Sequence, residues 1–207
     1  FERTCLHTDT RLHRADFDAI RPLSADFSGQ SFDLGARRAL RIPLLGEHQL
    51  KNAAVVIATV DALTAKGWHV SETQLREGLE CVRWSGRFEL LRTSPVFFVD
   101  GGHNPQCMAA LARNLEQYLS GRRLIALTGV MADKDYGDMY RLVAPYFSAF
   151  VTVTPDNPPA PGGDSDGGGA IVIVAAVGGA AVGVGAYIAG TTAYLKSVLP
   201  EGMAIPA

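Results

Sequence analysis

The sequence predicts an α/β fold, with a Rossmann-like, mostly parallel sheet and helices on both faces of it. An apolar run at residues 96–99 is followed by glycines and polar residues and then by helical spacing at 106–119. The same order returns at 124–128, which is apolar, and at 137–144, which has a helical pattern. Strands that alternate with helices of this length are typical of βαβ units, whose parallel sheets are covered on both faces.

Short strands and then two helices are expected in the first part of the chain. Apolar and polar residues alternate at 31–34 and 39–42, which indicates two or three strands. Residues 46–66 form a mostly apolar helical segment that ends near a glycine, and a helix of that composition should be largely buried. A second helix begins with a capping box, in which a glutamine follows Ser71 by three residues, and runs to about residue 82.

Residues 83–89 have the character of a connection between two domains, and a hairpin follows them. Its two strands are expected at 88–91 and 96–99, on either side of a Ser-Pro turn. A later strand is expected at 149–153, after the helix at 137–144. The hairpin therefore opens the second domain.

The turn at residues 100–105 combines the residue types of a ligand-binding site. Asn104 can cap the following helix, and Pro105 suits the first helical position because its missing donor would be unpaired there anyway. Asp100 and His103 supply polar contacts, the glycines between them allow close approach of the backbone, and the helix N-terminus offers N–H groups to an anion. An ordinary strand-to-helix turn with a capping Asn is the alternative.

The composition changes beyond residue 154. Residues 155–169, rich in Pro, Gly and Asp, form a flexible linker, and no charged residue occurs from 167 to 195. That apolar tract is long enough for a membrane span. We favour two buried strands instead, at 170–177 and 182–189, because glycine is frequent and no Trp, Arg or Lys anchors precede the tract. Membrane association is therefore not expected.

Charge and cysteine content limit the partners. The net charge of −2 and the pI near 6.2 of this 207-residue chain give no general attraction to nucleic acid or to anionic membranes. Three cysteines, far apart and without metal-ligand spacing, suit a reducing cytosol and predict no metal site. No targeting segment is visible, so a cytoplasmic protein is expected, and the missing initiator methionine suggests a chain cut from a longer one.

Four short motifs stand in order along the chain. The first, at residues 46–54, contains Gly-Glu-His-Gln and Asn-Ala-Ala, and the second, at 86–89, is Gly-Arg-Phe-Glu. The third, at 100–105, is Asp-Gly-Gly-His-Asn-Pro, and the fourth, at 129–135, is Gly-Val-Met-Ala-Asp-Lys-Asp. Together they resemble the folylpolyglutamate synthase/dihydrofolate synthase family of the Mur ligase superfamily. The resemblance implies that residues 1–84 are the C-terminal part of the central ATP-binding domain. Residues 85–207 would then be the C-terminal, glutamate ligase domain of a Mur ligase.

The resemblance implies an enzyme, an ATP-dependent amide ligase of the tetrahydrofolate synthase type. In this family ATP phosphorylates the terminal carboxylate of a folate, and the amine of glutamate attacks the acyl phosphate to give an amide. The implied partners are ATP, Mg²⁺, L-glutamate and a folate or dihydropteroate, and the full-length enzyme is expected to be a monomer. A cell-wall Mur ligase and a non-catalytic nucleotide-binding remnant are the alternatives.

The resemblance also implies site residues, although it assigns none to catalysis. Nucleotide contacts are implied for Asn52, Arg87, Asp100 and His103. Glutamate contacts are implied for His103, Lys134, Thr191 and Thr192. A carboxylate can hold ribose hydroxyls, and a guanidinium or an imidazole can bind phosphate or carboxylate. The structural alternatives are a helix cap for Asn52, a capping or solvated carboxylate for Asp100, and a surface ion pair for Arg87.

Departures from the family pattern concern both binding and chemistry. Ser85 and Gly102 stand where the family commonly has proline and alanine, and both residues are small enough to be tolerated. Pro159 stands in place of an arginine that could help to hold an anionic substrate. No Gly-x-x-x-x-Gly-Lys-Ser/Thr phosphate loop occurs in the chain. The ligands of the triphosphate and of magnesium are therefore expected upstream, and the chain alone should not turn over ATP.

Overall fold

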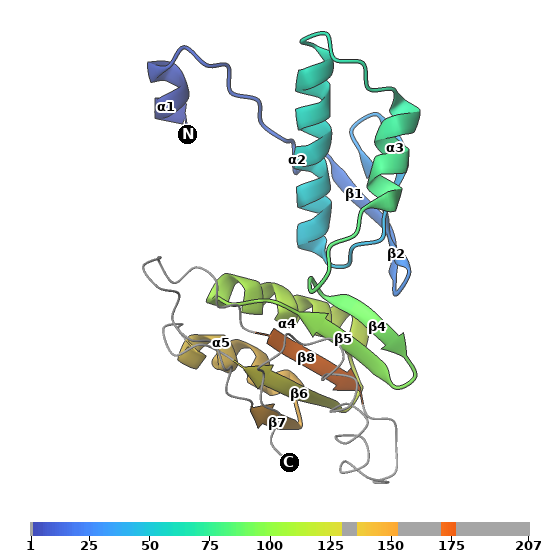
Figure 1. The fold of residues 1–207 in the computed structure, drawn as a ribbon, viewed down its shortest axis with the longest axis vertical. Helices are drawn as coiled ribbons and strands as arrows, with labels where there is room; N and C mark the ends of the chain where they lie inside the picture. Colours follow the sequence, from blue (N-terminus) through green and yellow to red (C-terminus); the bar gives the residue numbers. More distant parts are fainter. Residues whose placement is uncertain (1, 130–135, 153–170, 177–207) are drawn as a thin grey trace, which may run out of the picture. The chain divides into compact units, whose positions relative to one another are not determined.

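The computed structural model describes residues 2–129, 136–152 and 171–176 of the chain. The chain divides into two compact units, Phe1–Trp84 and Ser85–Ala207. Each unit has a sheet of its own, as Figure 1 shows. The division falls within the segment at 83–89.

The first unit is built on a three-stranded antiparallel sheet. Its strands are β1 (Ile20–Asp26), β2 (Gly29–Leu34) and β3 (Arg37–Ile42), with β2 in the centre. Gly29 has φ +139°, and a Cβ there would lie 2.4 Å from the carbonyl oxygen of Ile42, so only glycine fits where β2 begins beside β3. A short helix, α1 (Glu2–His7), precedes the sheet and has no buried residue.

Two helices, α2 (Glu47–Thr64) and α3 (Glu72–Cys81), complete the first unit. Its core consists of Phe32, Leu40, Ile42, Leu50, Ala53, Ile57, Leu75 and Leu79. The Ser71 hydroxyl accepts the N–H of Gln74 at 3.2 Å, and the side-chain oxygen of Gln74 accepts the N–H of Ser71 at 2.9 Å. The predicted capping box at the start of α3 is therefore confirmed.

The expectation that the first of these helices is largely buried is wrong. Val55 and Val56 are each 48 % exposed, and Leu63 is 36 % exposed. The buried residues of α2 lie in its first three turns, on the side that packs into the core. Apolar composition alone did not distinguish this side from the exposed one. The helix ends at Thr64, and Gly67 follows in the left-handed region at φ +93°, as the glycine signal predicts.

The second unit contains a five-stranded sheet in the order β4-β5-β8-β6-β7. The strands are β4 (Glu89–Thr93), β5 (Val96–Asp100), β6 (Leu124–Gly129), β7 (Ala149–Thr152) and β8 (Ile171–Ala176). β4 and β5 form the predicted antiparallel hairpin, whose turn contains a cis Ser94-Pro95 peptide bond. β6 and β7 pair in parallel and are separated in the sequence by α5 (Tyr136–Val143) and a 3₁₀ turn, Ala144–Tyr146.

The α/β class is confirmed, but the strand pairings are not mostly parallel. β8 runs between β5 and β6 and is antiparallel to both (Figure 1). Strands β5, β6 and β7 therefore run in one direction, as βαβ connections require. Among the described strands, however, only β6 and β7 are hydrogen-bonded in parallel. A run of Val and Ile fits a central strand of either direction, so composition could not decide the direction of β8.

The helices α4 (Pro105–Leu119) and α5 contact each other directly. α4 connects β5 to β6, and α5 connects β6 to β7, so both connections move toward the same edge of the sheet. Right-handed connections that move in the same direction place their helices on the same face of the sheet. In the described residues the helices therefore share a face, whereas the sequence predicts cover on both faces. On this side α4 buries Met108, Leu111, Leu115 and Leu119.

The structure describes only β8 within the apolar tract at 167–195. This strand coincides with the first of the two expected strands, at 170–177. The second expected strand, at 182–189, and the linker at 155–169 lie outside the described residues. Among the helices that the structure describes, none has the length and apolarity needed to cross a membrane.

Candidate functional site

The turn between β5 and α4 has the geometry that its sequence predicts. Asn104 is the N-cap of α4, and its side-chain oxygen accepts the N–H of Cys107 at 2.8 Å. Pro105 occupies the first position of the 15-residue helix, where no backbone donor is needed. Both local predictions are confirmed, and the start of α4 is therefore firmly held.

Both carboxylate oxygens of Asp100 accept backbone N–H groups. Oδ1 accepts from Gly102 at 2.7 Å, and Oδ2 accepts from Phe88 at 2.9 Å. Burial raises the pKa of Asp100 above its ordinary value of 3.8, although these two N–H donors and the charge of Arg87 act in the opposite direction. Asp100 thus ties the turn to an earlier segment, and each oxygen retains a lone pair that could accept from a ligand hydroxyl.

The Gly-Arg-Phe-Glu motif is that earlier segment, and it folds against the turn. The carbonyl oxygen of Gly86 accepts from Gly101 N at 2.6 Å, and the N–H of Gly86 donates to Glu89 Oε2 at 2.7 Å. Gly86 has φ +72° and Phe88 has φ +46°, so the residues on both sides of Arg87 are in the left-handed region. The two motifs together form one structural element.

Arg87 and His103 are the basic side chains of this element. Both are partly exposed, and the charge of Arg87 acts on Asp100. His103 Nδ1 lies 3.2 Å from the carbonyl oxygen of Gly101. Because a carbonyl oxygen only accepts, Nδ1 carries the proton in this contact, and Nε2 remains to meet a ligand. A guanidinium, an imidazole and a helix N-terminus are groups that bind phosphate or carboxylate.

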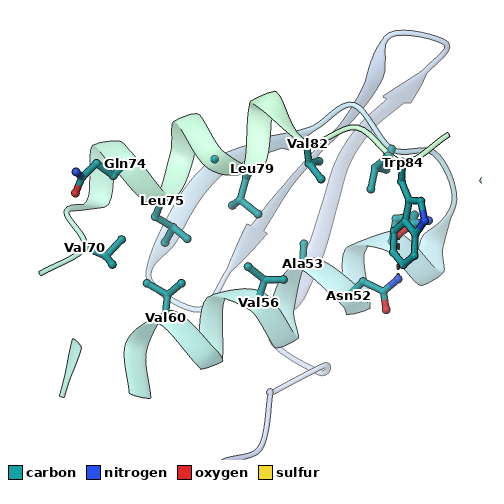
Figure 2. A pocket seen from close by; sticks show the side chains of 13 residues that line it. Asn52, Ala53, Val56, Val60, Val70, Gln74, Leu75, Leu79, Val82 and Trp84 are labelled. Atoms are coloured by element: carbon teal, nitrogen blue, oxygen red, sulfur yellow. Dashed lines mark hydrogen bonds between the residues drawn. The ribbon is translucent and has the colours of Figure 1, made fainter. Parts of the chain in front are cut away.

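Asn52 belongs to the first unit and is not a helix cap. It lies inside α2, whose N-cap is Gly46, and its Nδ2 donates to Gln49 Oε1 at 3.0 Å. Figure 2 shows Asn52 beside the indole of Trp84, at one end of a groove between α2 and α3. The groove has a volume of about 340 Å³, and most of its lining residues are apolar. The capping alternative for Asn52 is therefore wrong.

The structure places the predicted site residues in different parts of the chain. Arg87, Asp100 and His103 belong to the element of the second unit, while Asn52 belongs to the first unit. Lys134, Thr191 and Thr192 lie outside the described residues. In the described part of the chain, no group of three or more His, Cys, Asp or Glu side chains could hold a metal ion.

Glu89 and Phe88 have roles in the element that the sequence did not suggest. Glu89 follows Gly86 by three residues, the spacing at which a side chain reaches back to a backbone N–H in a capping box. That spacing is a signal by which Glu89 could have been found. The left-handed φ of Phe88 has no such signal, because bulky residues rarely adopt this conformation.

Comparisons of the sequence and of the structure with known proteins point to the same group of enzymes. Residues 86–180 match the family described as Mur ligase, glutamate ligase domain. The folylpolyglutamate synthase of Lacticaseibacillus casei is 32 % identical over 123 residues, which are 58 % of this chain and 28 % of that protein. The dihydrofolate synthase/folylpolyglutamate synthase of Mycobacterium tuberculosis is 32 % identical over 128 residues, 61 % of this chain and 26 % of that protein.

Solved structures agree with the sequence relatives. The structure of Mycobacterium tuberculosis folylpolyglutamate synthase complexed with ADP has a TM-score of 0.65 and 28 % identity, over 76 % of this chain and 36 % of that chain. The chain is thus similar to folylpolyglutamate synthases and dihydrofolate synthases in both sequence and structure. It spans about a quarter of the length of the two folylpolyglutamate synthase relatives named above. The stretch that matches the glutamate ligase domain contains Arg87, Asp100 and His103.

Proposed function

We propose that this chain is part of an ATP-dependent ligase that adds glutamate to folates. The observation that carries the proposal is the family match at residues 86–180, because two motifs within it form one hydrogen-bonded element at the start of α4. A related synthase was solved with ADP, which supports ATP as the nucleotide. In the proposed reaction ATP phosphorylates the terminal carboxylate of a folate. The amine of glutamate then displaces the phosphate, and an amide forms.

The element supplies binding and orientation in this proposal. Arg87 meets a nucleotide phosphate, since a guanidinium forms charge-assisted hydrogen bonds with phosphate oxygens. His103 meets the phosphate or the substrate carboxylate through Nε2. Asp100 accepts from the ribose hydroxyls with the lone pairs that the backbone leaves. Asn52 contacts the nucleotide from the first unit.

The remaining parts of the enzyme follow from the same proposal. Residues 1–84 belong to the central ATP-binding domain, and residues 85–207 form the glutamate ligase domain, with a linker at 155–169. Glutamate is held by His103, Lys134, Thr191 and Thr192. The ligands of Mg²⁺ lie mainly in the part of the enzyme upstream of this chain. The whole enzyme is a cytoplasmic monomer that acts on a folate or on dihydropteroate.

Equilibrium titration of the chain with ATP tests the nucleotide site. We expect saturable binding, which Arg87→Ala weakens by about tenfold because one charge-assisted contact is lost. Arg113→Ala is the matched control, since Arg113 is an exposed arginine on α4. This change should leave the affinity for ATP unchanged. A folded chain that binds no ATP would contradict the proposal and favour a non-catalytic remnant.

A chimera tests the substrate class. This chain would replace the matching portion of the Lacticaseibacillus casei enzyme, and the product would be analysed with ATP, glutamate and a choice of acceptors. We expect glutamate to be added to folates or to dihydropteroate. Product from UDP-muramyl acceptors alone would identify a cell-wall ligase instead. The chain by itself should give no product, because it contains no phosphate loop.

A further inference from the structure

We propose that Glu89 is a positioning residue for Arg87. Its carboxylate holds the backbone of Gly86 on one side of Arg87, while the carboxylate of Asp100 holds the backbone of Phe88 on the other side. The inference rests on the proposed function, in which Arg87 meets a phosphate group of the nucleotide. Glu89 then affects the affinity for this ligand without touching it.

Glu89 has a fixed base from which to hold Gly86. It is the first residue of β4 and is paired with Val99 of β5 in the ladder. Its Oε2 accepts the N–H of Gly86 at 2.7 Å, a distance typical of a charge-assisted hydrogen bond. The carbonyl of Gly86 accepts from Gly101 at 2.6 Å, so both backbone polar groups of Gly86 are engaged.

Asp100 restrains the residue on the other side of Arg87. It is the last residue of β5, and its Oδ2 accepts the N–H of Phe88 at 2.9 Å. The ring of Phe88 is 1 % exposed and stacks on Phe98, with 4.4 Å between the ring centroids. Phe88 therefore cannot move without losing a hydrogen bond and a buried ring contact.

These restraints matter because the backbone around Arg87 is in a disfavoured conformation. Phe88 has φ +46°, where the Cβ of an L residue is crowded by the backbone. Without the acceptors of Glu89 and Asp100, the segment would relax toward other backbone conformations, and the guanidinium of Arg87 would sample a wider range of positions. A guanidinium that is already ordered loses less conformational entropy when it binds an anion. The two carboxylates therefore strengthen the binding of phosphate by Arg87.

Two other roles for Glu89 make different predictions. Direct binding of phosphate by Glu89 is opposed by charge, since two anionic groups repel each other. A role in stability alone would lower the free energy of unfolding and leave the ATP affinity of the folded chain unchanged. Positioning predicts that the effects of Glu89 and Arg87 substitutions on ATP affinity are coupled.

A double-mutant cycle on ATP affinity tests this coupling. Glu89→Ala should weaken ATP binding by about fivefold to tenfold, and should have less than about a twofold effect when Arg87 is already Ala. Glu89→Gln keeps an acceptor oxygen and should bind within about threefold of the unchanged chain. Glu116→Ala, at an exposed glutamate on α4, is the control and should have no effect. Independent, additive losses from Glu89→Ala and Arg87→Ala would overturn the inference.

A second readout does not need ATP and separates this inference from the proposed function. In Glu89→Ala, hydrogen exchange at the Gly86 amide should become faster, and the NMR order parameter of the Arg87 Nε–H should fall. If the unchanged chain binds no ATP, the proposed function fails, and these two measurements still decide the role of Glu89. An Arg87 order parameter and a Gly86 exchange rate that stay unchanged would overturn it.

Another variant keeps the inference testable if Glu89→Ala does not fold. Glu89→Asp retains the charge but is one methylene shorter, so its carboxylate should not reach the Gly86 N–H. It should therefore behave like Glu89→Ala in the exchange and order measurements. An Asp variant that behaves like the unchanged chain in both measurements would overturn the inference, because the hydrogen bond from Glu89 would then not be needed to hold Gly86 and Arg87.

Discussion

Gly102 shows how closely the turn after β5 surrounds Asp100. Its N–H donates to Asp100 Oδ1 at 2.7 Å. A Cβ at this position would lie 2.8 Å from the same oxygen, 2.8 Å from Met108 Cε and 3.1 Å from Cys107 Cβ. These separations are shorter than van der Waals contacts, so a neighbouring side chain would have to move. Close packing around Asp100 and Met108 is therefore a physical reason for glycine at this position.

Substitution of Gly102 is expected to lower the free energy of unfolding, whereas substitution of a glycine in open space is not. Gly102→Ala should lower the free energy of unfolding by about 1–3 kcal/mol, because Asp100 or Met108 must shift. Gly78→Ala is the matched control, since Gly78 lies inside α3 and a Cβ there meets nothing within 4 Å. That change should raise the free energy of unfolding by about 1 kcal/mol through helix propensity. Urea denaturation measures both values.

An unchanged stability of Gly102→Ala would contradict this expectation. It would show that the turn accepts a methyl group by small movements of both the Asp100 carboxylate and the flexible end of Met108, at little cost in free energy.

At the scale of elements, a network of charges joins β3, α2 and α3 of the first unit. Arg37 of β3 makes two hydrogen bonds to Asp61 of α2, at 2.7 and 3.0 Å, and one to Glu72 of α3, at 3.0 Å. Arg76 contacts the other oxygen of Glu72 at 2.8 Å and donates to the carbonyl of Arg38 at 2.9 Å. One guanidinium therefore connects three elements.

This network predicts a pH-dependent contribution to stability. The hydrogen bond from Arg37 lowers the pKa of Glu72 below its ordinary value of 4.5. A group with a lower pKa in the folded state stabilises the fold above its unfolded pKa, and this contribution is lost as the pH falls through the folded value. Glu72→Gln should therefore reduce the free energy of unfolding at neutral pH by roughly 0.5–1 kcal/mol, a small effect because the side chain is about half exposed.

Denaturant titrations across the acidic range check this prediction. The difference in stability between the unchanged chain and Glu72→Gln should shrink as the pH falls below 4.5, the ordinary value of the carboxyl. Glu80→Gln serves as the control, since Glu80 is an exposed residue of the same helix. A difference that is the same at every pH would mean that the network does not act through the charge of Glu72.

At the scale of the whole molecule, the two units have separate cores. The core of the first unit surrounds Phe32, which is fully buried. In the second unit Phe98 is fully buried, and Phe88 lies against it and against Tyr118 of α4. Both tryptophans, Trp68 and Trp84, belong to the first unit. Tryptophan fluorescence therefore reports on the first unit, whereas circular dichroism reports on both.

Separate cores predict that the units respond separately to core substitutions. Phe32→Ala and Phe98→Ala should each destabilise their own unit by about 3–5 kcal/mol. Phe32→Ala should shift the unfolding transition seen by fluorescence. Phe98→Ala should leave that transition in place and shift a transition seen by circular dichroism. Equal shifts of both signals in both variants would show that the units unfold as one.

Local features of fold and site could be predicted from the sequence. The capping box at Ser71, the cap at Asn104 and the hairpin before it depend on residues that are close in the chain, and the structure has all three. Four motifs in order also predicted the similarity to folylpolyglutamate synthases that the comparisons find, because each motif is a short contiguous stretch. Capping, turn chemistry and periodicity act over a few residues, so a single sequence carries them in full.

What only the tertiary structure decided involves segments that are distant in the chain. The antiparallel insertion of β8 between β5 and β6 was not predictable, nor was the exposed side of α2. The contact of Asp100 with the Phe88 N–H also joins residues of different segments. Such contacts are selected by burial and hydrogen bonding in the assembled fold, which no local pattern encodes. By itself the sequence determined the local elements and the motifs that resemble the synthases, and the assembled fold decided that Glu89 and Asp100 accept the N–H groups of Gly86 and Phe88, on either side of Arg87.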